Sequence, residues 1–290
     1  MVSLETALAE MARRGKIAED LLSRERPELV DLFFTYQNEA IEARKFLESN
    51  LMELDFGADI LEVGGGILAL AAQLASEGFK VTTVEPVGEG FTGISFIMDI
   101  FLKIASQEEV FFTLIDCPIE DCSFECEFSF IFSINVMEHL NDPFSVLNQI
   151  KGILRPGGKY RFFCPNYDFP YEPHFGKLLW VRKRGSFYLE LNRIRTLELK
   201  NVDSIGLYNS LNFITVAKLQ AFSRESNLLL EFNRQAFHLL LLRSLSDPGL
   251  RARHRSFIPI VDFLSKIEFM GFSKLLPTRF QPVMDATLNN

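Results

Sequence analysis

The segment Ile60-Leu61-Glu62-Val63-Gly64-Gly65-Gly66-Ile67-Leu68-Ala69 joins a short apolar run to three consecutive glycines and then to helix-forming residues. An apolar run of this length predicts a buried strand. Glycines allow the backbone to turn sharply and to approach a ligand closely. A helix that begins directly after such a turn presents free N–H groups and the positive end of its dipole. The segment therefore predicts a strand–turn–helix unit that binds a nucleotide-like ligand.

Strands and helices alternate around this unit. The expected strands are residues 59–63, 80–84, 110–115, 127–133 and 158–164, and the expected helices are 66–77, about 89–105 and 143–154. Such alternation is typical of a parallel sheet covered by helices on both faces. Upstream, residues 4–24 and 28–52 carry apolar residues at three- and four-residue spacing, which predicts two further helices.

The alternation stops after Pro165. We expect irregular structure over 166–210, a helix over 213–226, a strand over 228–232, mostly helix over 234–270 around Asp247-Pro248-Gly249, and a last strand between Phe272 and Thr287. These patterns divide the chain into N-terminal helices at 1–56, a nucleotide-binding core at 57–166 and a carboxyl part at 167–290.

Composition and charge limit the classes of protein to which this chain can belong. The 290 residues are 48% hydrophobic and 23% charged, as in globular chains, and 29 phenylalanines predict an aromatic core. We find no uncharged apolar run of about 18 residues, and acidic residues near the start do not fit a signal peptide. We therefore expect a cytoplasmic protein whose membrane contact is at most peripheral.

The net charge of −8 is distributed unevenly, with −18 over residues 1–150 and +10 over residues 151–290. An acidic half of this size argues against nucleic-acid binding, which needs a continuous basic face. The basic half is able to attract an anionic substrate, although ordinary solvated helix faces explain the same counts.

Three of the four cysteines, Cys117, Cys122 and Cys126, lie close together. Their C-x4-C-x3-C spacing lacks the C-x2-C pair and the nearby histidine that a zinc site needs. Four cysteines do not indicate a disulfide scaffold either. We expect free thiols.

Two ligand classes fit the glycine turn. Gly64, Gly66 and Ala69 match the dinucleotide pattern G-x-G-x-x-A, and Glu85 follows the next strand, where a carboxylate is able to bind both ribose hydroxyls. These features suit a nicotinamide dinucleotide or S-adenosylmethionine. Glu62 favours the second, because it would repel a pyrophosphate and attract the ammonium group of a methionine moiety.

Further motifs follow in register. They are the Ile119-Glu120-Asp121 segment, Asn135-Val136-Met137-Glu138-His139-Leu140 after the fourth strand, and Leu154-Arg155-Pro156-Gly157-Gly158 before the fifth. With these motifs, residues 57–166 resemble the class I S-adenosylmethionine-dependent methyltransferases. The resemblance implies an α/β fold: a Rossmann-like, seven-stranded, mostly parallel, doubly wound sheet with N-terminal lid helices and a helical insertion after strand five. The chain departs from the family at Leu68, where a third glycine is common.

The resemblance also implies a set of cofactor-binding residues. Glu62 and the glycines would surround the methionine part, and Glu85 would bind the ribose. Asp116, Ile119 and Glu120 would lie near the adenine. The full set is Glu62, Gly64, Gly65, Gly66, Glu85, Pro86, Asp116, Ile119, Glu120 and Asn135.

No metal is expected. A similar quinone-pathway subfamily uses Glu, Glu and His for a divalent metal, but here Asn135 stands in place of the first acidic residue. Asparagine is the weaker ligand.

The loop from Pro165 to Gly176 is the best candidate for the acceptor side. In open parallel sheets, ligands bind outside the carboxyl ends of the strands. Tyr171, Glu172 and His174 would bind the acceptor or take its proton, with His139 as a second candidate base. A rigid loop that caps the sheet is the alternative, since three prolines hold it.

We therefore expect an enzyme that transfers a methyl group from S-adenosylmethionine to an oxygen or nitrogen atom, leaving S-adenosylhomocysteine. The acceptor would be a small molecule, anionic or linked to a lipid, sugar or nucleotide. The alternatives are an NAD(P)-dependent oxidoreductase and a non-catalytic methyltransferase-like binding module. The acceptor's identity and the oligomeric state stay open.

Overall fold

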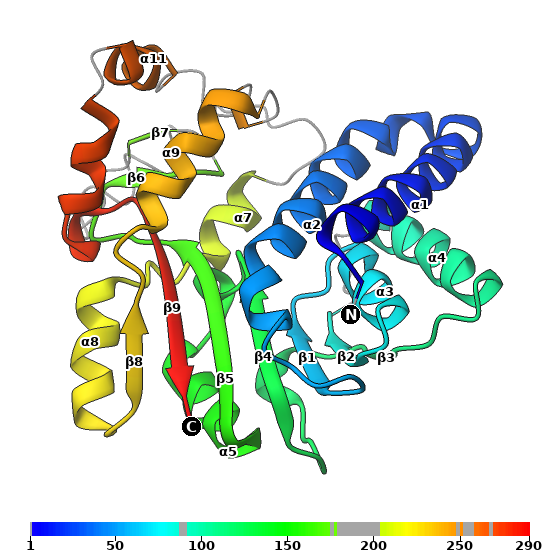
Figure 1. The fold of residues 1–290 in the computed structure, drawn as a ribbon, viewed down its shortest axis with the longest axis horizontal. Helices are drawn as coiled ribbons and strands as arrows, with labels where there is room; N and C mark the ends of the chain where they lie inside the picture. Colours follow the sequence, from blue (N-terminus) through cyan, green and yellow to red (C-terminus); the bar gives the residue numbers. More distant parts are fainter. Residues whose placement is uncertain are drawn as a thin grey trace. The chain divides into compact units, whose positions relative to one another are not determined.

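The computed structural model describes residues 2–86, 92–174, 177–178, 204–247, 250–251, 258–266 and 269–290. Among them, seven strands form one sheet in the order β3-β2-β1-β4-β5-β9-β8 (Figure 1). They are β1 (Asp59–Val63), β2 (Lys80–Val84), β3 (Thr113–Ile115), β4 (Phe128–Ile134), β5 (Leu154–Pro165), β8 (Leu229–Phe232) and β9 (Val283–Asn289). β1 pairs in parallel with β2 and β4, and β2 with β3, whereas β8 and β9 are antiparallel. The expected Rossmann-like, mostly parallel sheet is confirmed.

The chain divides into two compact units. Unit 1 comprises Met1–Ile134, Gln149–Tyr160 and Asn290, and unit 2 comprises Asn135–Asn148 and Arg161–Asn289. The glycine turn therefore belongs to unit 1, and the loop after β5 belongs to unit 2.

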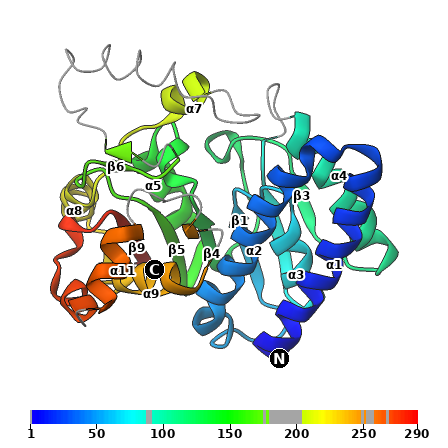
Figure 2. The same ribbon diagram turned by 90° about the horizontal axis from the view of Figure 1, so that it is seen from above.

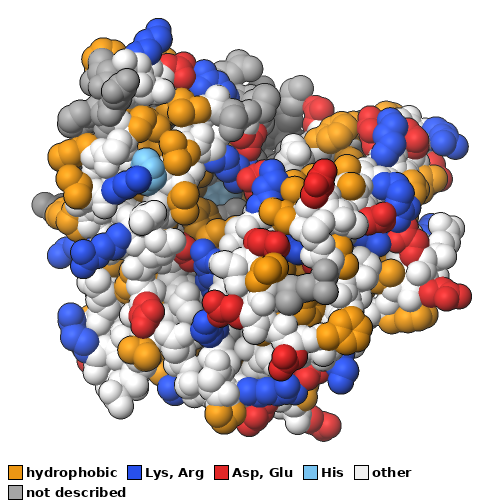
Figure 3. Space-filling model, viewed as in Figure 1, with side chains coloured by type: hydrophobic (Ala, Val, Ile, Leu, Met, Phe, Trp, Pro, Cys, Tyr) orange, Lys and Arg blue, Asp and Glu red, His pale blue; other side chains and the backbone are white. Residues whose placement is uncertain are grey.

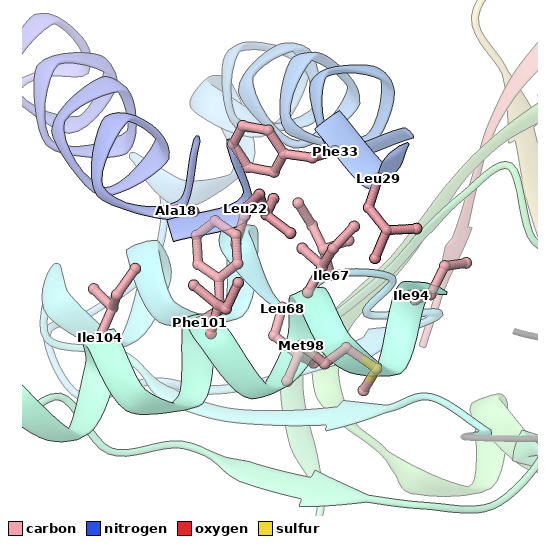
Figure 4. Packing of buried hydrophobic residues seen from close by; sticks show 13 residues of the cluster. Ala18, Leu22, Leu29, Phe33, Ile67, Leu68, Ile94, Met98, Phe101 and Ile104 are labelled. Carbon is pink, nitrogen blue, oxygen red and sulfur yellow. The ribbon is translucent and has the colours of Figure 1, made fainter. Parts of the chain in front are cut away.

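Unit 1 is built around a core that the N-terminal helices share with the glycine turn. Its helices are α1 (Leu4–Glu25), α2 (Val30–Leu51), α3 (Ala69–Ser76) and α4 (Thr92–Gln107), which lie side by side in Figures 1 and 2. Leu22 of α1, Phe33 of α2 and Phe101 of α4 pack against Ile67 and Leu68, directly after the glycines (Figure 4). Burying these side chains stabilises unit 1 and places α2 beside the turn.

A buried ion pair also joins α2 to α3. Arg44 is 1% exposed, and its guanidinium donates to both carboxylate oxygens of Glu77 at 2.8 Å. Gln73 donates to the same carboxylate at 2.9 Å and accepts from Arg14 of α1 at 2.6 Å. Buried charges are tolerated only when paired in this way, so the network fixes the helices against one another.

Unit 2 contains most of the carboxyl part. Its elements include η3 (Met137–His139), β6 (Tyr171–Glu172), β7 (Lys177–Leu178), α7 (Ser204–Ser210), α8 (Val216–Glu225), α9 (Ala236–Ser246), α11 (Ile258–Lys266), η4 (Phe269–Leu275) and η5 (Thr278–Phe280). α5 (Pro143–Ile153) begins here and ends in unit 1. The fully buried Asn166 donates to the carbonyls of Thr278, Arg279 and Gln281 at 2.8–3.2 Å. This side chain anchors the loop after β5.

Element boundaries differ from expectation where local backbone geometry intervenes. The helix expected at 66–77 begins at Ala69, because Leu68 has a left-handed φ of 66° and completes the turn. β5 begins at Leu154 rather than 158. The expected last strand is present as β9, whereas the region expected to be irregular contains β6, β7 and α7. Pro248 and Gly249 lie outside the described residues.

The expectation of free thiols is wrong for two cysteines. Cys117 and Cys122 form a disulfide, with Cα atoms 6.6 Å apart. The short turn η2 (Ile119–Asp121) between them folds the chain back and brings the two side chains within disulfide reach. Cys126 is an exposed free thiol and Cys164 a buried one.

The surface of the acidic half carries ion pairs. Acidic and basic side chains are interspersed over α1 and α2 (Figure 3), where Lys16 pairs with Glu19 and Asp20, and Lys45 with Glu42. Within the described residues, no helix is both long and apolar enough to cross a bilayer.

Candidate active site

The glycine turn has the backbone geometry of a ligand cradle. Gly64 has a φ of +84°, and its N–H donates to the carbonyl of Val84 at 2.8 Å, which ties the end of β1 to the end of β2. A Cβ at Gly65 would lie 2.2 Å from Oγ1 of Thr83. Glycine is therefore required at Gly64 by conformation and at Gly65 by close packing.

Glu62 is a buried carboxylate next to this turn. It is 4% exposed, and its Oε2 has no hydrogen-bond partner among the described residues. Removal from water raises its pKa to about 8, and the nearby charge of Glu85 adds to this effect. A carboxylate in this position is suited to pair with a cationic group of a ligand.

Glu85 is held over the turn. Its Oε2 accepts a hydrogen bond from the N–H of Gly66 at 2.9 Å, and its own N–H donates to Ile115 at the end of β3 at 3.1 Å. Burial raises the pKa of Glu85 to about 7, and the Gly66 bond opposes the rise. Pro86 follows it, and residues 87–91 lie outside the described part of the chain.

Tyr36 of α2 is a further candidate site residue, which the sequence analysis did not identify. Its ring lies 3.4 Å from where a Cβ at Gly66 would stand, and burial together with Glu39 and Glu85 raises the pKa of its phenol. The sequence pattern that predicts α2 includes Tyr36 among its apolar residues. Its phenol hydroxyl sets it apart from them and is the feature that could have indicated a role at the turn. Tyr36 covers the turn with an aromatic surface.

The remaining predicted cofactor residues follow β3 and β4. Ile119 is buried in η2, and the Gln149 side chain donates to its carbonyl at 3.0 Å. Asp116 is exposed and Glu120 half-buried. Asn135 begins unit 2, where it has a φ of 55° and donates to the carbonyl of Phe163 at 2.8 Å. Unit 1 thus brings together Glu62, the glycines and Glu85.

Unit 2 holds a second cluster, which contains three of the four predicted catalytic residues. Nδ1 of His174 lies 2.5 Å from Oε1 of the fully buried Glu172, and the hydroxyl of Tyr167 donates to the same oxygen at 3.2 Å. The rings of His139 and His174 are 5.2 Å apart. Nε2 of His139 lies 4.0 Å from Oε1 of Glu138, which is also fully buried.

The orientation of His139 is set by α7 and the segment after it. Nδ1 of His139 lies 2.9 Å from Oγ of Ser210, and the side chain of Asn212 donates to the carbonyls of Met137 and Leu140 at 2.7 and 2.9 Å. Burial lowers the pKa of His139 to about 4, so the imidazole is neutral at neutral pH. Nothing in the local sequence pointed to Ser210.

Tyr171, the fourth predicted catalytic residue, precedes Glu172 in β6. Burial raises the pKa of its phenol, and the charge of Glu172 adds to the rise. Phe175, the residue after His174, lies outside the described residues.

A comparison with protein families decides the class. The model described as "Methyltransferase domain" matches residues 32–201, more than half of the chain. The chain belongs to this methyltransferase family. The matched residues include the glycine turn, Glu85 and the motifs at residues 135–140 and 154–158. The match confirms the resemblance seen in the sequence.

Two proteins of Mycobacterium tuberculosis resemble this methyltransferase over most of its length. They are Uncharacterized protein Rv1509 of strain ATCC 25618 / H37Rv and Uncharacterized protein MT1557 of strain CDC 1551 / Oshkosh. Each is 38% identical over 252 residues, which cover 86% of this chain and 85% of the relative.

Solved structures are more distant. The plantazolicin methyltransferase BpumL is 11% identical, with 98% of each chain covered and a TM-score of 0.49. Phosphoethanolamine N-methyltransferase 2 of Haemonchus contortus is 15% identical with a TM-score of 0.49, and the alignment covers 87% of this chain. The methyltransferase spans about half of that protein, 52% of its length. The family assignment rests on the domain model.

Proposed function

We propose that this methyltransferase transfers the methyl group of S-adenosylmethionine to an oxygen or nitrogen atom of a small-molecule acceptor. The observation that carries the proposal is the pair Glu62 and Glu85 beside the glycine turn. Glu62 suits the ammonium group of the methionine part, and Glu85 suits the two ribose hydroxyls. The family match supports the same reading.

The charge of the turn argues against a dinucleotide. Glu62 is buried and Glu85 is half-buried, and burial already raises their pKa values to about 8 and about 7. A pyrophosphate would add two negative charges beside them, whereas S-adenosylmethionine carries a sulfonium and an ammonium. The two carboxylates would therefore attract S-adenosylmethionine and repel a pyrophosphate.

The acceptor side of the proposal rests on the cluster in unit 2. His174, His139 and Glu172 form a polar set after β4 and β5, where open sheets bind their ligands, and Tyr171 precedes Glu172 in β6. These residues would hold the acceptor and help to remove its proton when the acceptor is a hydroxyl. The net charge of +10 over residues 151–290 favours an anionic acceptor, such as one linked to a lipid, sugar or nucleotide.

Equilibrium dialysis tests the cofactor. The purified chain is incubated separately with S-adenosylmethionine, S-adenosylhomocysteine, NAD⁺ and NADP⁺, alongside the Glu62→Gln variant and a control, Glu127→Gln, at an exposed position. We expect both sulfur compounds to bind and both dinucleotides to fail. Dinucleotide binding that Glu62→Gln strengthens would overturn the proposal.

Methyl transfer is tested with S-adenosylmethionine that carries a labelled methyl group and a protein-free cell extract as the pool of acceptors. Labelled product that forms with the wild type, but not with the Glu85→Ala variant, supports catalysis. Tight cofactor binding without any labelled product would instead indicate a binding module.

A further inference from the structure

The cluster in unit 2 has the composition of a metal site. Glu138, His139 and His174 each place a ligand atom within 4.8 Å of the others. We propose that these three residues bind a divalent first-row transition ion of the Zn²⁺, Mn²⁺ or Fe²⁺ type. Two imidazole nitrogens and one carboxylate oxygen suit such ions better than Mg²⁺ or Ca²⁺, which prefer oxygen ligands alone.

Hydrogen bonding places the lone pair of His139 on Nε2. The hydroxyl of Ser210 donates to the carbonyl of Leu207 at 2.8 Å, so its oxygen accepts from Nδ1–H of His139 at 2.9 Å. With the proton on Nδ1, Nε2 carries the electron pair that a metal ion needs.

The same tautomer follows for His174 by a different contact. Its Nδ1 lies 2.5 Å from Oε1 of Glu172, and a carboxylate accepts rather than donates, so Nδ1 bears the proton. A carboxylate that holds the far nitrogen of a metal-bound histidine is the recurrent outer partner of such sites, because it fixes the ring and makes it a better donor. Tyr167 in turn holds Glu172.

Burial and charge favour a cation at this point. Glu138 and Glu172 are both 0% exposed, and a dication would offset the cost of burying two carboxylates beside the two histidines. The side chains of His139 and His174 are 28% and 26% exposed, so an ion is able to enter from solvent. Three protein ligands leave coordination positions for water or an acceptor group.

The sequence argued against a metal because Asn135 replaces an acidic residue. The structure brings His174, which follows β6, to the segment after β4, and His174 would supply the third ligand. The role that we assign to the ion in the reaction rests on the proposed methyl transfer. A bound hydroxyl would release its proton to water more readily, and its oxygen would then attack the methyl carbon, leaving the carbon–sulfur electron pair on sulfur.

Cobalt binding by the full chain tests this site. The protein is treated with a chelator, dialysed and titrated with Co²⁺, which is followed by visible absorption and calorimetry. We expect one ion per chain with nitrogen and oxygen ligands, and at least a tenfold loss of affinity in His139→Ala, His174→Ala and Glu138→Gln. Glu172→Gln, which removes only the outer partner, should weaken binding about 10–100-fold.

His238→Ala is the matched control, because His238 also bonds a serine, Ser273, at 2.8 Å but lies outside the cluster. It should bind Co²⁺ as the wild type does. S-adenosylhomocysteine affinity, measured in parallel, should be unchanged in every variant, which shows that the variants are folded and separates this proposal from the cofactor assignment. Equal Co²⁺ affinity in the wild type and in a His139→Ala/His174→Ala variant would overturn the site, as would a sulfur-to-cobalt band that disappears in Cys126→Ser.

Discussion

The carboxylate of Glu85 accepts a hydrogen bond from the backbone N–H of Gly66 at 2.9 Å. One residue at the end of β2 thereby holds the last glycine of a turn that follows β1. The bond keeps the carboxylate beside the glycine turn, and it also steadies the turn itself.

Glu85→Ala is expected to lose cofactor affinity while the protein stays folded. A carboxylate that accepts two ribose hydroxyls makes charge-assisted bonds of roughly 1.5–3 kcal/mol each. Calorimetry with S-adenosylhomocysteine measures the loss, with Glu127→Gln as the control. Unchanged affinity would remove Glu85 from the site.

Gly65→Ala is expected to abolish cofactor binding, because the new Cβ would stand 2.2 Å from Oγ1 of Thr83. Thr83→Ala deletes that oxygen, so the Gly65→Ala/Thr83→Ala double variant should recover part of the affinity. The same calorimetric titration compares the three variants. A single Gly65→Ala variant that binds normally would mean that the turn does not need close packing.

The stability of the ligand-free protein should fall as pH rises. Burial raises the pKa values of Glu62 and Glu85 to about 8 and about 7, above about 4.3 in an unfolded chain. The folded state therefore binds more protons, and this contribution is complete below about pH 4 and lost as pH rises through about 8. Thermal unfolding between about pH 5 and pH 9 measures the slope.

Glu62→Gln should flatten that pH dependence, since an amide carries no charge to bury. S-adenosylhomocysteine should also flatten it in the wild type, because its ammonium group pairs with the ionised Glu62. A slope that neither change affects would place its origin elsewhere in the chain.

Arg44→Met should destabilise unit 1 by about 3–5 kcal/mol, because it leaves the buried Glu77 carboxylate without its cation. Urea denaturation measures the free energy of unfolding. Arg44→Met/Glu77→Gln should regain much of the loss. Lys45→Ala removes an exposed pair on the same helix and should change stability by less than about 0.5 kcal/mol.

His174→Ala should lower methyl transfer by about 10²–10⁴-fold while S-adenosylhomocysteine binds normally, because removal of the acceptor's proton contributes only to the chemical step. Single-turnover measurements with saturating cofactor separate the two effects. A variant with normal turnover would exclude the cluster from the reaction.

The local sequence predicted the fold of this protein and proposed the residues of its cofactor side. Alternating strands and helices predicted the parallel sheet, and the glycine turn with Glu62 and Glu85 predicted the ligand class. These features arise from short-range physics: apolar periodicity, the backbone freedom of Gly64, and carboxylates placed at the ends of neighbouring strands. Because the carboxyl ends of parallel strands meet at one edge of a sheet, the order of strands in the sequence is enough to predict that these residues lie near one another.

Tertiary structure decided the remainder, because contacts between distant segments leave no periodic signal. Ser210 reaches His139 from 71 residues away, and the ring of His174, which follows β6, lies 5.2 Å from that of His139. The Arg44–Glu77 pair and the ring of Tyr36 over Gly66 are of the same kind. Each depends on which surfaces pack together, and that packing is settled by the burial of the whole core rather than by any single stretch of sequence.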